Sequence, residues 1–343
     1  LIFGGNDGKF YLLISKYAPN FGINIEYIKG ERFFFPYFLG LISKITSVDL
    51  YFLYQLNFLF LVLLLIFFYS EILVLIKVKN YIYFISLFLV IFNPYLIRYY
   101  IAIPTIIVDL GFIISLELIA IGFLKKQKKF LFFGMILATL SRQNSIIILF
   151  VFYIIKFFYK RKSILEYKDL LLLSVIFGII YSLNTFYAIN SSNSLNEVEN
   201  LYLTTLFGIL IIDYTLIDLF RYLYFPILGF GPLLLFLIIL LLKKKLEINK
   251  DEIIIFSILV SLLLIGIAFV GGPTTTGKNL IRLANFSYIY IIISIIYCLK
   301  IDKMKIKTDK IYLIFGFIIF FWSFHPTFSN VKIWKFASKL INF

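Results

Sequence analysis

The stretch LYFLYQLNFLFLVLLLIFFY, residues 50–69, contains no charged side chain and is apolar along nearly its whole length. A helix needs ~20 such residues to cross the hydrocarbon core of a bilayer. Similar apolar runs recur from one end of the chain to the other, separated by short polar segments. The stretch therefore predicts a transmembrane helix, and its repetition predicts a protein that crosses the membrane several times.

The composition of the 343 residues agrees, with 62% hydrophobic and 15% charged, whereas soluble domains are about half apolar and about a quarter charged. The apolar runs are continuous rather than alternating, which favours helices over a β-barrel. No polar segment is long enough for a separate soluble domain. We predict an all-α, polytopic transmembrane bundle, a single integral membrane domain over residues 1–343, with about ten membrane segments of which two are short.

The predicted full-length spans are 50–69, 81–98, 105–124, 169–188, 226–242, 253–271, 284–300 and 311–325. The segment 130–158 is long for one helix and is interrupted by Ser141-Arg142-Gln143-Asn144. Two short helices meeting at this polar corner are expected, because non-helical backbone at membrane depth must face protein or a wet cavity. The chain begins with LIFGG rather than Met, and we expect this piece to be the end of a preceding first helix.

The net charge of +15 comes from Lys and Arg in short loops between apolar runs, whereas the loop 189–203 contains neither. This distribution indicates membrane topology rather than nucleic-acid binding, and the positive-inside rule places the basic loops in the cytoplasm. All basic loops fall on the same side of the membrane only if the segment 204–225 does not cross it but lies along the outer interface. This topology gives two external regions. One is 189–225. The other is a first external loop, 4–49, whose segments KFYLLISKYA and FFFPYFLGLISKI predict amphipathic surface helices.

Five motifs follow one another along the chain: GGNDGKFYLLISK (4–16), ERFFFPYFLGLIS (31–43), IAIPTIIVDLGFIIS (101–115), LATLSRQNSIIIL (137–149) and GKNLIRLANFSYIYIII (277–293). In this order they resemble the external loops and the Leu-Ser/Thr-Arg-Glu/Gln corner of GT-C-fold glycosyltransferases, which are polytopic enzymes. Asn6 stands where the family usually has an aromatic residue, and the second motif is kept only loosely. The resemblance implies a GT-C-like fold in a bacterial cytoplasmic membrane, with an outward-facing active site.

The resemblance also implies the reaction, which is transfer of a sugar from a polyprenyl-phosphate donor to a hydroxyl of a glycan, lipid or protein acceptor. Such a transfer needs a base for the acceptor hydroxyl and positive charge for the leaving phosphate, and the planar fork of Arg suits phosphate. No cofactor is certain, although a divalent metal is possible. The implied catalytic residues are Asp7, as general base, and Asp109, as a second carboxylate that orients the acceptor or holds a metal.

The remaining implied site residues fall into two groups. The donor phosphate is expected to contact Arg98, Arg142, Lys278 and Arg282. Support of the acceptor or of the loop is expected from Tyr11, Arg32 and Gln143.

Most of these residues also have a purely structural interpretation. Asn-Asp-Gly is a strong turn signal, so Asp7 could be a solvated turn residue. Asp109 could be a charge favoured by a helix N-terminus, and Arg142 could pair with Glu117. Arg98, and similarly Lys278 and Arg282, could be interfacial anchors. Arg32 could form a surface pair with Glu31.

Two other functions remain open from the sequence. An O-antigen polymerase or ligase also has an external Arg-rich site, but its largest external loop usually comes late in the chain, whereas here it comes first. A transporter or flippase often shows paired halves with broken helices in corresponding places, and the sequence shows only one convincing polar corner.

Overall fold

The computed structural model describes residues 7–20, 25, 27–93, 95–159, 163–191, 252–270 and 280–301, together with 229–231, 233–234, 237–238, 317–318 and 321–322. Every regular element in these residues is helical. Three helices are long and apolar enough to cross a membrane: α4 (Leu50–Ile76), α7 (Ile107–Lys125) and α10 (Tyr167–Ser191). The chain is therefore a helical membrane protein, as predicted from its apolar runs.

The other helices are shorter. At the start of the chain they are α1 (Gly8–Tyr17), α2 (Tyr27–Gly30) and α3 (Phe34–Thr46), followed after α4 by α5 (Asn80–Phe92) and α6 (Ile97–Ala102). The rest are α8 (Lys128–Ser141), α9 (Ser145–Tyr159), α14 (Glu252–Val270), α15 (Leu280–Ala284), the 3-10 turn η5 (Asn285–Ser287) and α16 (Tyr288–Ile301). The described part thus contains three full-length spans rather than about ten. The segment 204–225 and most of 226–242 and 311–325 lie outside it.

Local signals set the ends of α4. The side chain of Asp49 accepts a hydrogen bond from the backbone N of Phe52 at 2.9 Å, which satisfies a donor that the first turn leaves free. The helix ends where Lys77 takes a left-handed conformation with φ of 58°. It is longer than the predicted 50–69 because Glu71 does not break it, and the carboxylate instead pairs with Lys125 Nζ at 2.8 Å.

The polar corner in the fourth motif, at Ser141 to Asn144, is confirmed. Helix α8 ends at Ser141, Arg142 is extended, and α9 begins at Ser145. The backbone N of Ser145 donates to the carbonyl of Arg142 at 3.2 Å, which closes the turn. The Arg142 side chain at this corner is buried in the protein.

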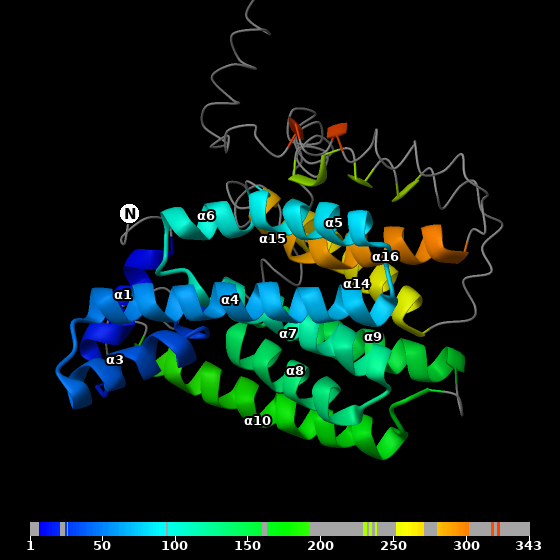
Figure 1. Cartoon of the computed structure of the whole chain (residues 1–343). Coiled ribbons are helices and arrows are strands. Elements are labelled where there is room, and N and C mark those ends of the chain that lie inside the picture. Colours follow the sequence, from blue (N-terminus) through cyan, green and yellow to red (C-terminus); the bar gives the residue numbers. More distant parts are fainter. Residues whose placement is uncertain are drawn as a thin grey trace, which may run out of the picture.

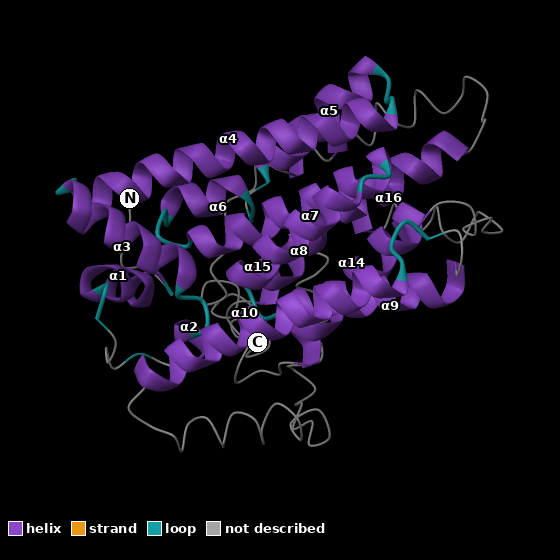
Figure 2. Ribbon diagram, turned by 90° about the horizontal axis from the view of Figure 1, so that it is seen from below, coloured by secondary structure: helices purple, strands orange, loops and turns teal. Residues whose placement is uncertain are grey.

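Helix α7 is the centre of the bundle. Of its apolar 18-residue stretch 89% is buried, compared with 22% for the corresponding stretch of α10. It packs on α4 and α8 and lies between them and the α14–α16 region (Figure 2). Close packing on α8 depends on Gly134, where a Cβ atom would come within 2.8 Å of the carbonyl oxygen of Ser115. Small residues at such crossings let helices approach closely in membranes.

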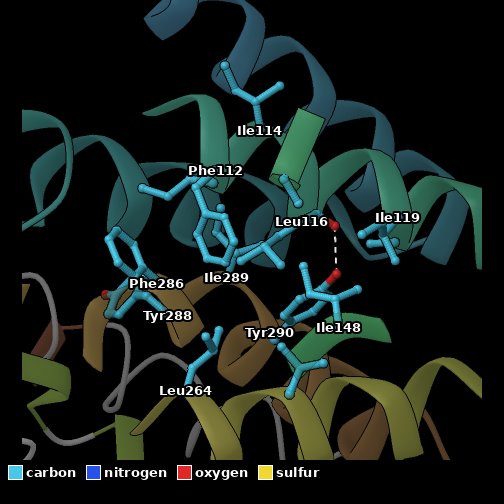
Figure 3. Packing of buried hydrophobic residues seen from close by; sticks show 14 of the residues in the cluster. Phe112, Ile114, Leu116, Ile119, Ile148, Leu264, Phe286, Tyr288, Ile289 and Tyr290 are labelled. Atoms are coloured by element: carbon cyan, nitrogen blue, oxygen red, sulfur yellow. Dashed lines mark hydrogen bonds between the residues drawn. The ribbon is translucent and has the colours of Figure 1, made fainter. Parts of the chain in front are cut away.

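On its other side α7 packs against α16 (Figure 3). The ring of Phe112 meets the ring of Phe286 edge-on at 5.3 Å. The Tyr290 hydroxyl donates to the carbonyl of Leu116 at 2.6 Å. These contacts join η5 and α16 to the central helix.

The two ends of the bundle are formed by different helices. Helices α1 and α3 lie together at one end, where α4 begins (Figure 1). They are docked onto the bundle, because Ser15 donates to the carbonyl of Pro36 at 2.6 Å and shares a 2.7 Å hydrogen bond with Tyr54 of α4. The predicted helices of the first loop are therefore present. The opposite end carries basic residues such as Lys125, and Lys128, which pairs with Asp169 at 2.6 Å.

Candidate functional site

Asp7 lies directly before α1 and is only 6% exposed. Its Oδ1 lies 2.8 Å from Lys29 Nζ, and its Oδ2 accepts a hydrogen bond from Arg282 Nη2 at 2.8 Å. Arg32 Nη1 is 3.9 Å from the same Oδ2. The interpretation of Asp7 as a solvated turn residue is therefore wrong. Its carboxylate joins the first described helix to one that follows 275 residues later in the chain.

Asp109 is fully buried in the first turn of α7. Its Oδ1 accepts from Arg142 Nε at 2.8 Å, and its Oδ2 accepts from the Tyr100 hydroxyl at 3.2 Å. The same Oδ2 lies 3.4 Å from Arg282 Nε. Arg282 therefore bridges Asp7 and Asp109, which places both predicted carboxylates in one cluster.

Arg142 pairs with Asp109 and not with Glu117, so the alternative structural pairing is wrong. The side chain is 1% exposed, and its guanidinium carbon lies 4.6 Å from the centre of the Phe286 ring. A cation over an aromatic face gains electrostatic stabilisation, and the gain is larger without water. Asp109 and Phe286 together hold the guanidinium plane in a fixed orientation.

Arg32 and Gln143 form the third side of the cluster. Arg32 Nε donates to Gln143 Oε1 at 3.2 Å, and Arg32 Nη1 donates to the Tyr11 hydroxyl at 3.5 Å. Gln143 Nε2 in turn donates to Glu31 Oε2. Because Glu31 is 5% exposed and Arg32 contacts buried groups, the interpretation of these two residues as a surface pair is wrong.

The cluster contains more positive than negative charge. Lys29, Arg32, Arg142 and Arg282 contribute four cations, whereas Asp7, Asp109 and Glu31 contribute three carboxyl groups. Removing a charge from water costs several kcal/mol per ion unless a partner compensates it. A buried cluster with excess positive charge therefore favours an anionic ligand.

The carboxyl groups at the edge of the cluster differ in pKa. Burial by itself raises the pKa of Asp7, but the charges of Arg282, Lys29 and Arg32 outweigh it and hold the pKa well below its usual range. Burial raises the pKa of Glu31, which Gln143 and Arg32 only partly oppose. Asp7 is thus an anion at neutral pH and a weak base while its cations remain in place.

The cluster does not fit a divalent metal. Among the described residues, no three His, Cys, Asp or Glu side chains form a group that could hold one. Asp7 and Asp109 each face guanidinium groups at 2.8 Å. The positive charge of these groups would repel a divalent metal ion.

The structure thus brings together Tyr11, Arg32, Asp109, Arg142, Gln143 and Arg282 with Asp7. It also adds Lys29, Glu31, Tyr100 and Phe286, which the sequence analysis did not assign to the site. Lys29 and Glu31 had a signal in IKGER (28–32), where the charged Lys29 comes just before the second motif and Glu31 begins it. Arg98 belongs to α6, and both its side chain and the whole of Lys278 lie outside the described part.

No protein-family model matches the chain, and neither a curated protein nor a solved structure matches it.

Proposed function

We propose that this protein is a membrane glycosyltransferase of the GT-C kind. It moves a sugar from a polyprenyl-phosphate donor to an acceptor hydroxyl and uses Asp7 as the general base. The observation that carries the proposal is the bridge made by Arg282 between Asp7 and Asp109 within a buried cluster that has excess positive charge. The motifs that resemble the family are far apart in the sequence, and this bridge joins three of them.

The donor phosphate binds to the guanidinium groups. Arg presents a rigid fork of N–H donors that matches two phosphate oxygens at once. Nη2 of Arg142 is buried and has no acceptor among the described residues. A phosphate oxygen supplies that acceptor and neutralises the excess charge, which also stabilises the leaving phosphate as the reaction proceeds.

Binding of the phosphate also changes Asp7. In the described arrangement Arg282 and Lys29 hold the Asp7 carboxylate and make it a weak base. When these cations turn to the phosphate, the pKa of Asp7 rises toward its usual range, because opposite charges lower the pKa of a carboxyl group. Asp7 becomes a competent base only when the donor is present.

The transfer step is a single displacement. The acceptor oxygen attacks C1 of the sugar as its proton moves to an Asp7 carboxylate oxygen. The bond between C1 and the phosphate oxygen breaks, and its electron pair leaves with the polyprenyl phosphate. Attack opposite the leaving group inverts C1, and only one carboxylate has to act as a base.

The distribution of charge supports an outward-facing site. The basic residues at the ends of α4 and α7 and at the start of α8 belong to the end of the bundle opposite α1 and α3. The positive-inside rule assigns such residues to the cytoplasm. The cluster at Asp7 then faces the outside of the cytoplasmic membrane, where a polyprenyl carrier presents its sugar.

The test uses the full chain in lipid nanodiscs, with binding of polyprenyl monophosphate measured separately from sugar transfer. Asp7→Asn is expected to abolish transfer and to retain phosphate binding, since it removes an anion from the cluster. Arg282→Lys keeps the charge but loses the fork, so it is expected to weaken phosphate binding at least about tenfold, equivalent to ~1.4 kcal/mol.

The matched control is Lys168→Gln, because Lys168 is 77% exposed and contacts no residue of the cluster. It is expected to leave binding and transfer unchanged. Unchanged turnover in a correctly inserted Asp7→Asn variant would remove Asp7 from the mechanism. Substrate-dependent uptake into vesicles without any transferred sugar would favour the transporter instead.

A further inference from the structure

A third acidic side chain, Glu117, is buried inside the bundle away from the cation cluster. It lies on α7 and is fully buried. It follows Asp109 by eight residues on the same helix, which corresponds to ~12 Å along the axis. The glycosyl transfer described above does not use it.

The surroundings of Glu117 differ from those of the other two acids. Asp7 and Asp109 each have a guanidinium nitrogen at 2.8 Å. Both carboxyl oxygens of Glu117 lack a hydrogen-bond partner in the part of the chain that the structure describes, and no ion pair there includes it. An isolated carboxylate in apolar surroundings is very costly, and such a group takes up a proton instead.

The titratable groups that face Glu117 add no positive charge. Tyr69 of α4 and Tyr290 of α16 interact with it electrostatically, and both are fully buried. The Tyr290 hydroxyl already donates to the carbonyl of Leu116 (Figure 3). A neutral phenol cannot balance a carboxylate charge as a cation does.

Among the described residues, the other elements packed on α7 also place no cation in an ion pair with Glu117. In α8 the only ionisable residues are Lys128 and its neighbour Lys129 in the first turn, where Lys128 pairs with Asp169. In α14 the only one is Glu252, whose carboxylate accepts from the backbone N of Ile164 at 3.3 Å. Helix α3 contributes Lys44 in its last turn and a neutral phenol.

We propose that Glu117 is a proton-binding site within the bundle, where it remains a neutral carboxylic acid at neutral pH, separate from the cation cluster. Ionisable side chains inside membranes are rare and usually functional. A neutral acid of this kind is a hydrogen-bond donor that an unpaired carboxylate cannot be.

The deciding measurement is the infrared spectrum of the full chain in lipid nanodiscs at neutral pH. A protonated carboxyl group has a C=O stretch that is separate from the carboxylate and amide bands. Wild-type protein is expected to show this acid band, and Glu117→Gln is expected to lose it. The amide replaces the neutral acid with a group of the same shape, so the variant is expected to fold.

The matched control is Glu71→Gln, because Glu71 is part-exposed and pairs with Lys125. It is expected to retain the acid band and to lose carboxylate intensity. The proposal is overturned if wild-type protein has no acid band at neutral pH, or if Glu117→Gln loses carboxylate intensity instead. A wild-type spectrum without an acid band overturns the proposal even if the variant fails to insert.

A second measurement identifies the residue by chemistry. A lipid-soluble carbodiimide adds to a protonated carboxyl group. The acid proton moves to one carbodiimide nitrogen, the carboxyl oxygen bonds to the central carbon, and rearrangement gives a stable N-acylurea with no leaving group. The adduct is expected on Glu117 and not on Asp7 or Asp109. Adducts on those two aspartates would overturn the contrast on which the proposal rests.

Discussion

Breaking the pair between Asp109 and Arg142 is expected to destabilise the protein strongly. Both side chains are fully or almost fully buried, and the Nε to Oδ1 distance is 2.8 Å. Removing one partner of a buried pair costs ~3–5 kcal/mol, because it leaves an uncompensated charge. The two single variants Asp109→Asn and Arg142→Gln should therefore both lower the free energy of unfolding, but by different amounts.

The remaining contacts predict which variant is worse. After Arg142→Gln, the Asp109 carboxylate keeps the Tyr100 hydroxyl at 3.2 Å and Arg282 Nε at 3.4 Å, so the loss is expected near ~3 kcal/mol. After Asp109→Asn, Arg142 keeps only the Phe286 ring among its described contacts, and the excess positive charge increases. That loss is expected near ~5 kcal/mol.

The double variant, with both Asp109→Asn and Arg142→Gln, measures the interaction energy between the two side chains. Since it removes both charges, its loss should be smaller than the sum of the single losses by ~1–3 kcal/mol, the coupling typical of residues in contact. Unfolding is measured by titrating a denaturing detergent into mixed micelles and following the near-UV circular dichroism of the 25 tyrosines. Lys168→Gln, at a 77% exposed position, should unfold as wild type does. Additive losses, or single losses below about 1 kcal/mol, would refute the pairing.

Two further predictions concern helix packing and pH. Gly134→Ala should lower stability by ~1–3 kcal/mol through overpacking, because its Cβ would lie 2.8 Å from a carbonyl oxygen of α7, whereas Gly178→Ala, with nothing within 4 Å, should be neutral or slightly stabilising in the same unfolding titration. The free energy of unfolding of wild type should exceed that of Asp7→Asn by a constant amount from neutral pH down to about 3.8, the pKa of the carboxyl group in the unfolded chain. The difference should shrink below that pH, because the pKa of the folded carboxyl is lowered. A difference that already falls between pH 7 and 5 would contradict the ion pairs of Asp7.

The helices were predictable where the signal was local. Ser141 to Asn144 is a polar run between apolar runs, and the corner lies there. The predicted span 81–98 was too long, since α5 ends at Phe92. The signal was present in Asn93-Pro94, because the residue before a proline is disfavoured in helical conformation.

The grouping of the site was predictable, but the partners within it were not. Arg142 could have paired with Asp109 or with Glu117, and the sequence offers both acids on one helix. The choice depends on how α8 packs along α7, a tertiary contact that includes the close approach at Gly134. Lys29 belongs to the site because α2 lies beside α1, a tertiary contact that the charged residues of IKGER do not specify by themselves.

The bridge through Arg282 also constrains how the chain is synthesised. Asp7 and Asp109 leave the ribosome long before Arg282 does, and until then their cationic partners among the described residues are Lys29, Arg32 and Arg142. The amino-terminal helices must insert with the site incomplete. Asp7 and Asp109 gain their shared counter-ion only when α15 docks, so a nascent chain stalled before residue 282 should be open at this end and readily digested there by protease.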